Sequence, residues 1–360
     1  KIMIKTGKWI VCRFPVFFLR TGKESAILYA MSRKKAVVRK PKIKKKTDYY
    51  DYSLLAVIIL LTCFGLVMLY STSSYMAELN YGDDMYYFKK QAAISLACII
   101  AALAISQIDY HILTRFTGVI YGVAAVLMLL VKTPLGRSAN GARRWLNLGL
   151  LSFQPSELAK IAVIVCLSYM IVNMGRKIGT LKGFMMLAGS GGALAFITYV
   201  FTDNLSTAII IFGITIGLIF IAHPKVRPFL IAAGILLVVA IVAISFLSAT
   251  METSSSFRLR RILVWLHPED YASGDGYQTI QALYAIGSGG FLGRGLGNSI
   301  QKLGSVPEAQ NDMILSIVCE ELGILGGMIV LLLFAYLLYR LFFIAQNASD
   351  LFGSLIVSGI

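Results

Sequence analysis

The chain alternates long apolar runs with short polar segments, and the runs have the length of membrane-spanning helices. A helix needs about 20 mostly apolar residues to cross a bilayer. Runs that are poor in charge predict spans near residues 53–73, 91–108, 113–131, 157–173, 183–201, 204–222, 228–248 and 312–339. A ninth run begins near residue 350 and reaches Ile360, so we expect its helix to continue further. The pattern predicts an all-α fold, a polytopic bundle of membrane helices.

Two polar segments between the runs are longer than ordinary turns. One extends from Lys132 to Pro155, and the other, the longest in the chain, extends from Ala249 to Asn311. Segments of this length in a compact protein are usually functional or disordered. The second contains a Gly-rich apolar piece, residues 285–293, which is too short to span and favours a re-entrant or interfacial segment.

Composition supports the same class and adds an orientation. Hydrophobic residues make up 57% of the chain and charged residues only 14%. Of the 34 Lys and Arg, 15 lie in residues 1–47, before the first apolar run, and such a cluster is typical of a cytoplasmic anchor beside anionic lipid. The sequence thus predicts a basic cytoplasmic tail, residues 1–47, followed by a transmembrane domain, residues 48–360. We expect translation to start at Met31, with residues 1–30 lying upstream of the true start.

With the N-terminus inside, both long polar segments lie on the outer face. The short inner and outer loops carry similar numbers of cations, so the tail decides the orientation. The net charge of +16 is concentrated beside the membrane, and nucleic acid is not an expected partner. The five cysteines are dispersed, with neither metal-ligand spacing nor a disulfide framework.

The first candidate site is the motif at residues 307–312, just before the eighth predicted span. Pro307 suits the first turn of a helix. If a helix starts there, Glu308 and Asp312 lie on one face, four residues apart. Acids at membrane depth are costly and therefore indicate function, in this case a base at the outer surface. A preference of both acids for the positive helix N-terminus is the structural alternative.

The second candidate site follows the third span. Arg143 and Arg144 lie on the outer side, against the positive-inside tendency, and guanidinium groups bind phosphate bidentately. Contact with lipid headgroups is the alternative for them, and a place in the interfacial belt is the alternative for Trp145. Glu157 and Lys160, one turn apart, are expected to form an ion pair.

Two further polar clusters have mainly structural interpretations. Residues 202–207 are expected to form a tight outer turn with helix caps. Arg258, Arg260 and Arg261 are expected to be a solvated face or to contact headgroups.

Together these segments resemble the SEDS family, the shape, elongation, division and sporulation proteins, over roughly residues 50–360. The resemblance rests on residues 141–145, 153–157, 276–278, 287–290, 295–302, 307–312 and 320–323. Residues 295–302 resemble the FtsW and SpoVE branch more than the RodA branch. The chain departs from the family pattern at Gln310-Asn311, which replace a common His-Thr pair, and at Thr202-Asp203-Asn204.

The resemblance implies a ten-helix glycosyltransferase of the bacterial cell membrane, with about nine helices present in this chain. It would polymerise lipid II into peptidoglycan strands during division or sporulation. Asp312 would be the catalytic base and Glu308 its support. The implied substrate-binding residues are Arg143, Arg144, Trp145, Glu157, Lys160, Gln278 and Ser288.

Partners and a cofactor are implied in the same way. A class B penicillin-binding transpeptidase is the expected partner, with other division or sporulation proteins. A divalent cation, Mg²⁺ or Mn²⁺, is expected to share the pyrophosphate with the arginines, and no organic cofactor is expected. A lipid II flippase and a non-catalytic division scaffold are the alternative functions. A small-molecule transporter is disfavoured, since the intramembrane charges are few.

Overall fold

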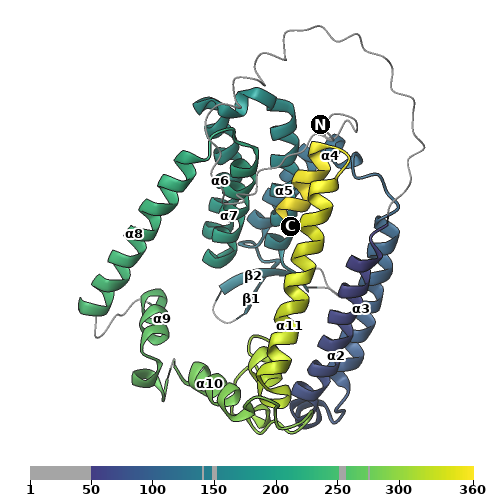
Figure 1. Ribbon diagram of the computed structural model, residues 1–360, viewed down its shortest axis with the longest axis vertical. Coiled ribbons are helices and arrows are strands. Elements are labelled where there is room, and N and C mark those ends of the chain that lie inside the picture. The colour runs from purple at the N-terminus through teal and green to yellow at the C-terminus, as the bar shows by residue number, and fades with distance from the viewer. Residues whose placement is uncertain (1–49, 140–141, 148–151, 251–256, 275) are drawn as a thin grey trace, which may run out of the picture.

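The computed structural model describes residues 50–139, 142–147, 152–250, 257–274 and 276–360. The predicted tail, residues 1–47, lies outside them, as does the start at Met31. Most described residues are helical (Figure 1). The apolar helices are α2 (Tyr52–Tyr81), α3 (Tyr86–Ile105), α4 (Ile112–Leu130), α5 (Pro155–Met174), α6 (Leu181–Thr202), α7 (Leu205–Ala222), α8 (Arg227–Thr250), α11 (Ile314–Asn347) and α12 (Leu351–Gly359).

Each of the nine predicted apolar runs forms a helix. Seven helices in the described part of the chain are long and apolar enough to cross a membrane: α2, α3, α4, α5 with the short helix η1 (Gly175–Gly179), α6, α7 and α11. Side-chain caps start several of them. The Leu54 amide donates to Asp51 at the start of α2, and the Thr207 amide donates to Asn204 at the start of α7. The polytopic membrane bundle is thereby confirmed.

The helices form two groups. In the first, α4, α5, α6 and α7 pack around a core that includes Met128, Val163, Leu187 and Ile211, all without exposed surface. Small residues bring these helices together, as where Gly191 of α6 meets Thr215 of α7. The second group joins α2 to α3 and α11. The last helix, α12, packs on α5, α7 and α11 and so links the two groups.

Figure 1 places the predicted inner loops at one end of the molecule and the predicted outer loops towards the other. At the end that holds the predicted inner loops, Arg340 of α11 donates to Asp51, with 2.5 Å between Nη2 and Oδ2. Tyr110, before α4, donates its hydroxyl hydrogen to Asp350, which caps α12. These contacts hold the helices together at this end of the bundle.

The first long polar segment contains a small antiparallel sheet that the sequence did not predict. Its strands are β1 (Gly136–Ala139), β2 (Ala142–Asn147) and β3 (Ser152–Phe153), in the order β1-β2-β3. The register pairs Gly136 with Leu146, and it shifts between Arg137 and Ser138. The sheet contacts α5 and α6. It therefore adds a β element to an otherwise helical fold.

The second long polar segment is more helical than expected. Its elements are α9 (Phe257–Leu266), η2 (Pro268–Tyr271), α10 (Tyr277–Gly289) and η3 (Gln301–Leu303). The Gly-rich piece forms the end of α10 and the turn after it. Helix α10 packs on α11, so this segment is fixed to the second helix group.

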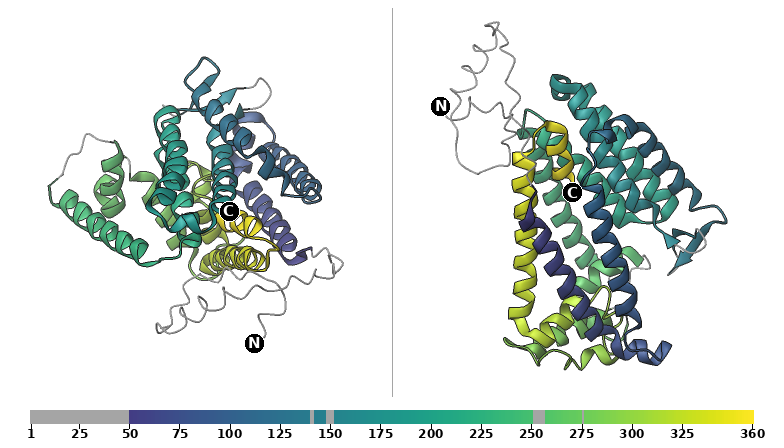
Figure 2. Two further views of the ribbon diagram at one scale, coloured as in Figure 1. Left: turned by 90° about the horizontal axis from the view of Figure 1, so that it is seen from above. Right: turned by 90° about the vertical axis from the view of Figure 1, so that its right-hand side faces the viewer.

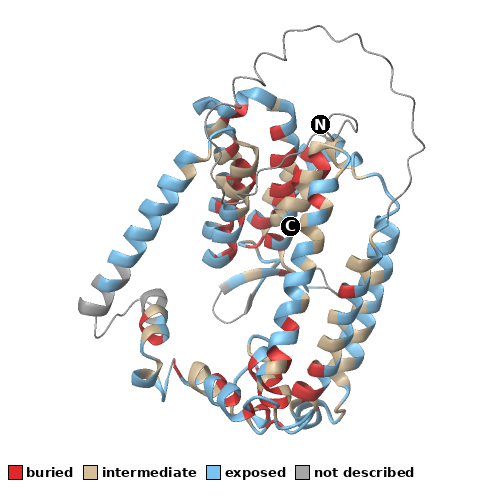
Figure 3. Ribbon diagram, in the orientation of Figure 1, coloured by how far each residue is buried: buried red, intermediate tan, exposed pale blue. Residues whose placement is uncertain are grey.

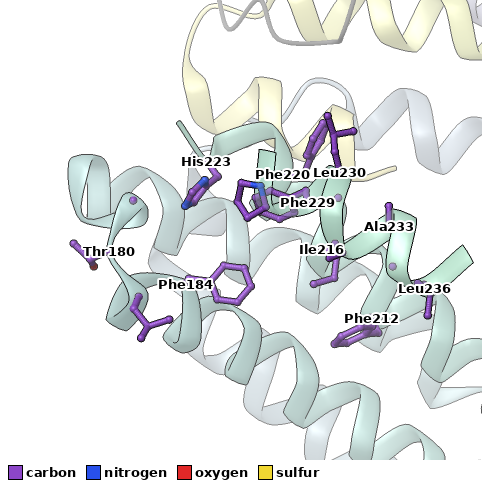
Figure 4. A pocket seen from close by; sticks show the side chains of 16 residues that line it. Thr180, Phe184, Phe212, Ile216, Phe220, His223, Phe229, Leu230, Ala233 and Leu236 are labelled. Carbon is purple, nitrogen blue, oxygen red and sulfur yellow. The ribbon is translucent and has the colours of Figure 1, made fainter. Parts of the chain in front are cut away.

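Helix α8 extends away from the bundle (Figures 1 and 3). Its apolar side chains are mostly exposed, Leu236 by 70%. An aromatic contact holds its first turn, where Phe229 lies 5.5 Å from Phe220 and 5.4 Å from His223 between ring centroids. Beside this contact an apolar pocket of about 1030 Å³ opens between α6, α7 and α8 (Figure 4).

Candidate active site

The motif at residues 307–312 forms consecutive turns rather than a helix. Helix α11 begins at Ile314, so the predicted helix start at Pro307 is wrong. Glu308 adopts a left-handed backbone conformation, with φ of 54°, which interrupts any helix there. Its carbonyl accepts from the Asn311 amide at 3.0 Å. Glu308 and Asp312 are therefore neighbours in a folded turn and do not share a helical face.

Both acids of this acidic turn, residues 307–313, are exposed. The Glu308 carboxylate accepts a hydrogen bond from the Asn311 side chain at 2.6 Å. Within the described part of the chain, the Asp312 carboxylate has no hydrogen bond or ion pair. Gln278 at the start of α10 donates its side-chain N–H to the Pro307 carbonyl at 3.2 Å. The structure thus joins Gln278 to the turn and leaves the Asp312 side chain exposed.

The basic residues gather at the opposite helix group. Arg143, Arg144 and Trp145 lie on β2. We call the two arginines, together with Lys132, the basic cluster. Lys132 forms a 3.1 Å ion pair with Asp203, and Arg144 reaches the carbonyl of the same residue. Asp203 ends α6 in the left-handed conformation, and Asn204 caps α7, so the predicted capped turn is confirmed. The sheet is docked on this turn.

Glu157 and Lys160 form the predicted ion pair in the first turns of α5, with 2.7 Å between Oε2 and Nζ. Gln154 takes the N-cap position of this helix. Its side chain donates to the Ser156 hydroxyl at 3.0 Å. The pair lies beside the basic cluster, since β2 contacts α5.

Ser288 lies farther along α10 than Gln278 does. Its hydroxyl donates to the Ala285 carbonyl within the helix, and its own carbonyl accepts from Arg294. In the described chain no hydrogen bond joins Ser288 to the acidic turn.

The acidic turn and the basic cluster do not touch in this structure. No hydrogen bond or ion pair among the described residues joins Glu308 or Asp312 to Arg143, Arg144 or Lys160. Both further views in Figure 2 place the sheet and α11 on opposite sides of the molecule. The sequence predicted the common outer location of these residues and could not give their separation.

Sequence reasoning missed a buried polar network behind the acidic turn. It consists of Ser71 on α2, Ser299 and Lys302 before the turn, and Glu320 and Glu321 on α11. Lys302 forms a 2.8 Å ion pair with Glu321. Two adjacent acids inside an apolar run were a readable signal, because ionisable groups at membrane depth need partners.

The network surrounds a break in α11 at Gly323, which has φ of 70°. The segment after α10 bonds to the backbone on both sides of this break. The Arg294 and Gly295 amides donate to the carbonyls of Glu320 and Glu321 at 3.0 and 2.9 Å, and the Ile324 amide donates to the Gly290 carbonyl. Broken helices are tolerated in membranes where protein satisfies the freed groups in this way.

A protein-only metal site is not apparent in the described chain. No group of three or more His, Cys, Asp or Glu side chains comes together there. The described residues therefore do not form a cage of protein ligands for Mg²⁺ or Mn²⁺.

Comparison with known proteins places these features in a family. The model of the FtsW/RodA/SpoVE cell cycle proteins matches residues 51–360. A probable peptidoglycan glycosyltransferase FtsW of Trichlorobacter lovleyi is 35% identical over 333 residues, covering 90% of this chain and 82% of that protein. Stage V sporulation protein E of Bacillus subtilis is 34% identical, covering 88% and 84%.

Solved structures share the fold. A chain from a study of how a peptidoglycan synthase complex coordinates polymerization and crosslinking has a TM-score of 0.67 at 24% identity, covering 87% of this chain and 83% of that one. The rod shape determining protein RodA of Thermus thermophilus has a TM-score of 0.58 at 23% identity, covering 87% and 81%. With a family model that spans residues 51–360, the chain belongs to the FtsW/RodA/SpoVE family of cell cycle proteins, which are multi-pass membrane proteins.

Proposed function

We propose that this chain is a peptidoglycan glycosyltransferase that polymerises lipid II at the outer surface of the bacterial cell membrane. The names of its curated relatives support the activity. The observation that carries the mechanism is the acidic turn, where the Asp312 carboxylate is exposed and unpaired in the described chain. A general base needs such access to the proton that it removes.

Asp312 accepts the proton of the acceptor's 4-hydroxyl as that oxygen attacks the anomeric carbon of the donor sugar. The bond from the anomeric carbon to the pyrophosphate oxygen breaks, with inversion, and the lipid pyrophosphate leaves. Arg143 and Lys160 bind this leaving group and stabilise its charge. Glu308, held by Asn311, supports the conformation of the turn.

Orientation and partner belong to the same proposal. The N-terminus lies in the cytoplasm, because the basic tail precedes the first span. This places the acidic turn and the basic cluster outside. A class B penicillin-binding transpeptidase is the proposed partner, because one structural neighbour comes from a complex that joins polymerization to crosslinking.

Asp312→Asn tests the base. The amide keeps the size of the side chain but cannot accept the proton, so we expect polymerisation to fall by about 10²-fold or more. The measurement is glycan formation on a gel from purified protein and fluorescent lipid II. Glu308→Gln, which keeps a carbonyl acceptor for Asn311, is the matched control and should retain most activity.

Three measurements separate the alternatives. Lipid II moving between leaflets without polymer would indicate a flippase. Normal polymerisation by a correctly inserted Asp312→Asn variant would end the assignment of the base, and a cell-division function that survives without any polymerase activity would indicate a scaffold.

A further inference from the structure

Two adjacent carboxylates on α11, Glu320 and Glu321, are completely buried, and the proposed chemistry uses neither of them. Burying a carboxylate costs free energy unless partners and hydrogen bonds compensate it. The partners come from two other parts of the chain, α2 and the segment before the acidic turn. The network therefore joins three segments that are distant in sequence.

Lys302 is the centre of these contacts. Its side chain is 8% exposed, and its ammonium group donates to Glu321 at 2.8 Å, to the Gly297 carbonyl at 2.7 Å and to the Ser71 hydroxyl at 3.0 Å. An ammonium group has three N–H donors, so every donor is used. The Ser71 hydroxyl in turn donates to Glu321 at 2.7 Å. These bonds fix Lys302 in one position against α2 and α11.

Glu320 holds the same segment at a second point. It accepts from the Ser299 hydroxyl at 2.5 Å and from the Ile300 amide at 3.2 Å. The Ser299 oxygen also accepts from the Lys302 amide at 3.1 Å. The two acids thus hold consecutive parts of one short segment, which leads directly into the acidic turn.

We propose that Lys302 and Glu321 are positioning residues, which set the place of the acidic turn relative to α2 and α11. An apolar contact would allow the segment to slide along the helices, whereas directional bonds from a buried ammonium group select one register. Stability is a weaker explanation, since buried ion pairs often contribute little compared with apolar packing. The inference rests on the proposed function only in that Asp312 makes the position of this turn important.

The first test measures position without substrate. Nitroxide labels are placed at Tyr52→Cys and Leu303→Cys in a full-length chain whose native cysteines are replaced. Both sites are exposed. Lys302, the neighbour of Leu303, contacts Ser71 on α2. Ser71 lies 19 residues from Tyr52, about 29 Å along that helix, so the separation of the two labels suits double electron–electron resonance. We expect one narrow distance distribution in the parent and a clearly broader one in Lys302→Met.

The second test measures activity with the same substitutions. Small displacements of catalytic groups can cost about 10²-fold in rate, so Lys302→Met and Glu321→Gln should lower kcat at least about tenfold and leave KM for lipid II within about threefold. Lys302→Arg, which keeps the charge, should recover part of kcat. Lys89→Met breaks an exposed ion pair with Asp83 and should change neither readout.

Each outcome decides the proposal. A narrow distribution in Lys302→Met would overturn it, and so would a broad distribution with normal kcat. If Lys302→Met does not insert, Ser71→Ala is measured in its place, because it removes both the bond that Lys302 donates to Ser71 and the bond that Ser71 donates to Glu321. A parent protein that makes no polymer would contradict the proposed function alone, because the resonance measurement uses no substrate.

Discussion

Arg143 and Arg144 are neighbours on β2 but differ in their exposure and in their contacts. Arg144 is partly buried and reaches the Asp203 carbonyl, so it helps to dock the sheet. Arg143 is exposed and has no partner among the described residues. Of the two, Arg143 is the better candidate for substrate pyrophosphate.

Arg143→Ala should therefore raise KM for lipid II by about tenfold or more, because hydrogen bonds to charged groups contribute about 1.5–3 kcal/mol. Arg143→Lys should recover this only in part, since lysine cannot bind phosphate bidentately. Steady-state polymerisation kinetics measure the effect. Arg144→Ala is the comparison, and we expect it to lower thermal stability instead. A larger KM effect at Arg144 would reverse the two assignments.

Asp51, the N-cap of α2, should make stability depend on pH. Burial by itself would raise the pKa of its carboxyl, but hydrogen bonds from the Leu54 amide and the Arg340 guanidinium outweigh it and hold that pKa below its ordinary value. A depressed pKa stabilises the fold above the unfolded-state pKa of about 3.9, and the effect is lost as pH falls through the folded-state value.

Asp51→Asn keeps a good N-cap and removes only the charge. We expect the variant to be destabilised by about 3 kcal/mol at neutral pH, because it leaves Arg340 without this counter-ion. Thermal unfolding in detergent against pH measures the difference, which should shrink below about pH 4. A difference that is the same at every pH would contradict this account.

Sequence could predict contacts between residues that are close along a helix and not those between distant segments. Glu157 and Lys160 are one turn apart, so their ion pair followed from helical geometry. Ser71, Lys302 and Glu321 meet only because α2, the outer segment and α11 fold together. The left-handed conformation of Glu308 is also not encoded in its residue type.

Among the elements, long apolar helices were the most predictable, because hydropathy alone requires them in a membrane. The sheet was missed since its strands have four, six and two residues, too few to show a clear alternation. The Gly-rich piece, residues 285–293, was predicted as a re-entrant or interfacial segment, and its close packing on α11 depends on glycine. A Cβ on Gly293 would lie 2.2 Å from the Glu321 carbonyl oxygen.

The break in α11 gives a test at this scale. Gly323 has φ of 70°, and a Cβ there would lie 2.2 Å from the Phe291 carbonyl oxygen. Gly323→Ala should therefore destabilise the protein by at least about 2 kcal/mol and reduce polymerisation. Gly122→Ala in α4, where a Cβ would meet no atom within 4 Å, is the matched control and should be neutral or slightly stabilising. Thermal unfolding and polymer yield are the two measurements, and equal behaviour of both variants would refute the constraint.

For the whole molecule, the proposed function together with the separation of the acidic turn from the basic cluster predicts motion during catalysis. The anomeric carbon of the donor is bonded directly to the pyrophosphate, so base and pyrophosphate ligands must approach one bound substrate. The two helix groups are linked through α12, near the inner end. A hinge there would bring the outer ends together.

Labels at Leu79→Cys on α2 and Leu135→Cys before the sheet would report this closure, as both sites are exposed. In a cysteine-free Asp312→Asn background, where substrate is not consumed, lipid II should shorten the distance measured by double electron–electron resonance. Undecaprenyl phosphate, which lacks the sugars and one phosphate, is the control and should have a smaller effect. An unchanged distance with lipid II would exclude closure between these two points.

The exposure of the α8 side chains should affect how fast the sequence of this helix changes in evolution. Its apolar side chains from Leu230 to Val242 are mostly exposed, whereas many residues of α5 are buried against neighbouring helices. Most rearrangements of the apolar residues within α8 would be equally stable in a bilayer. The helix therefore needs the right hydropathy and length, and few positions in it need a particular residue. Descendants of this chain should accept neutral exchanges in α8 much faster than in α5, with the aromatic contact at Phe229 as the exception.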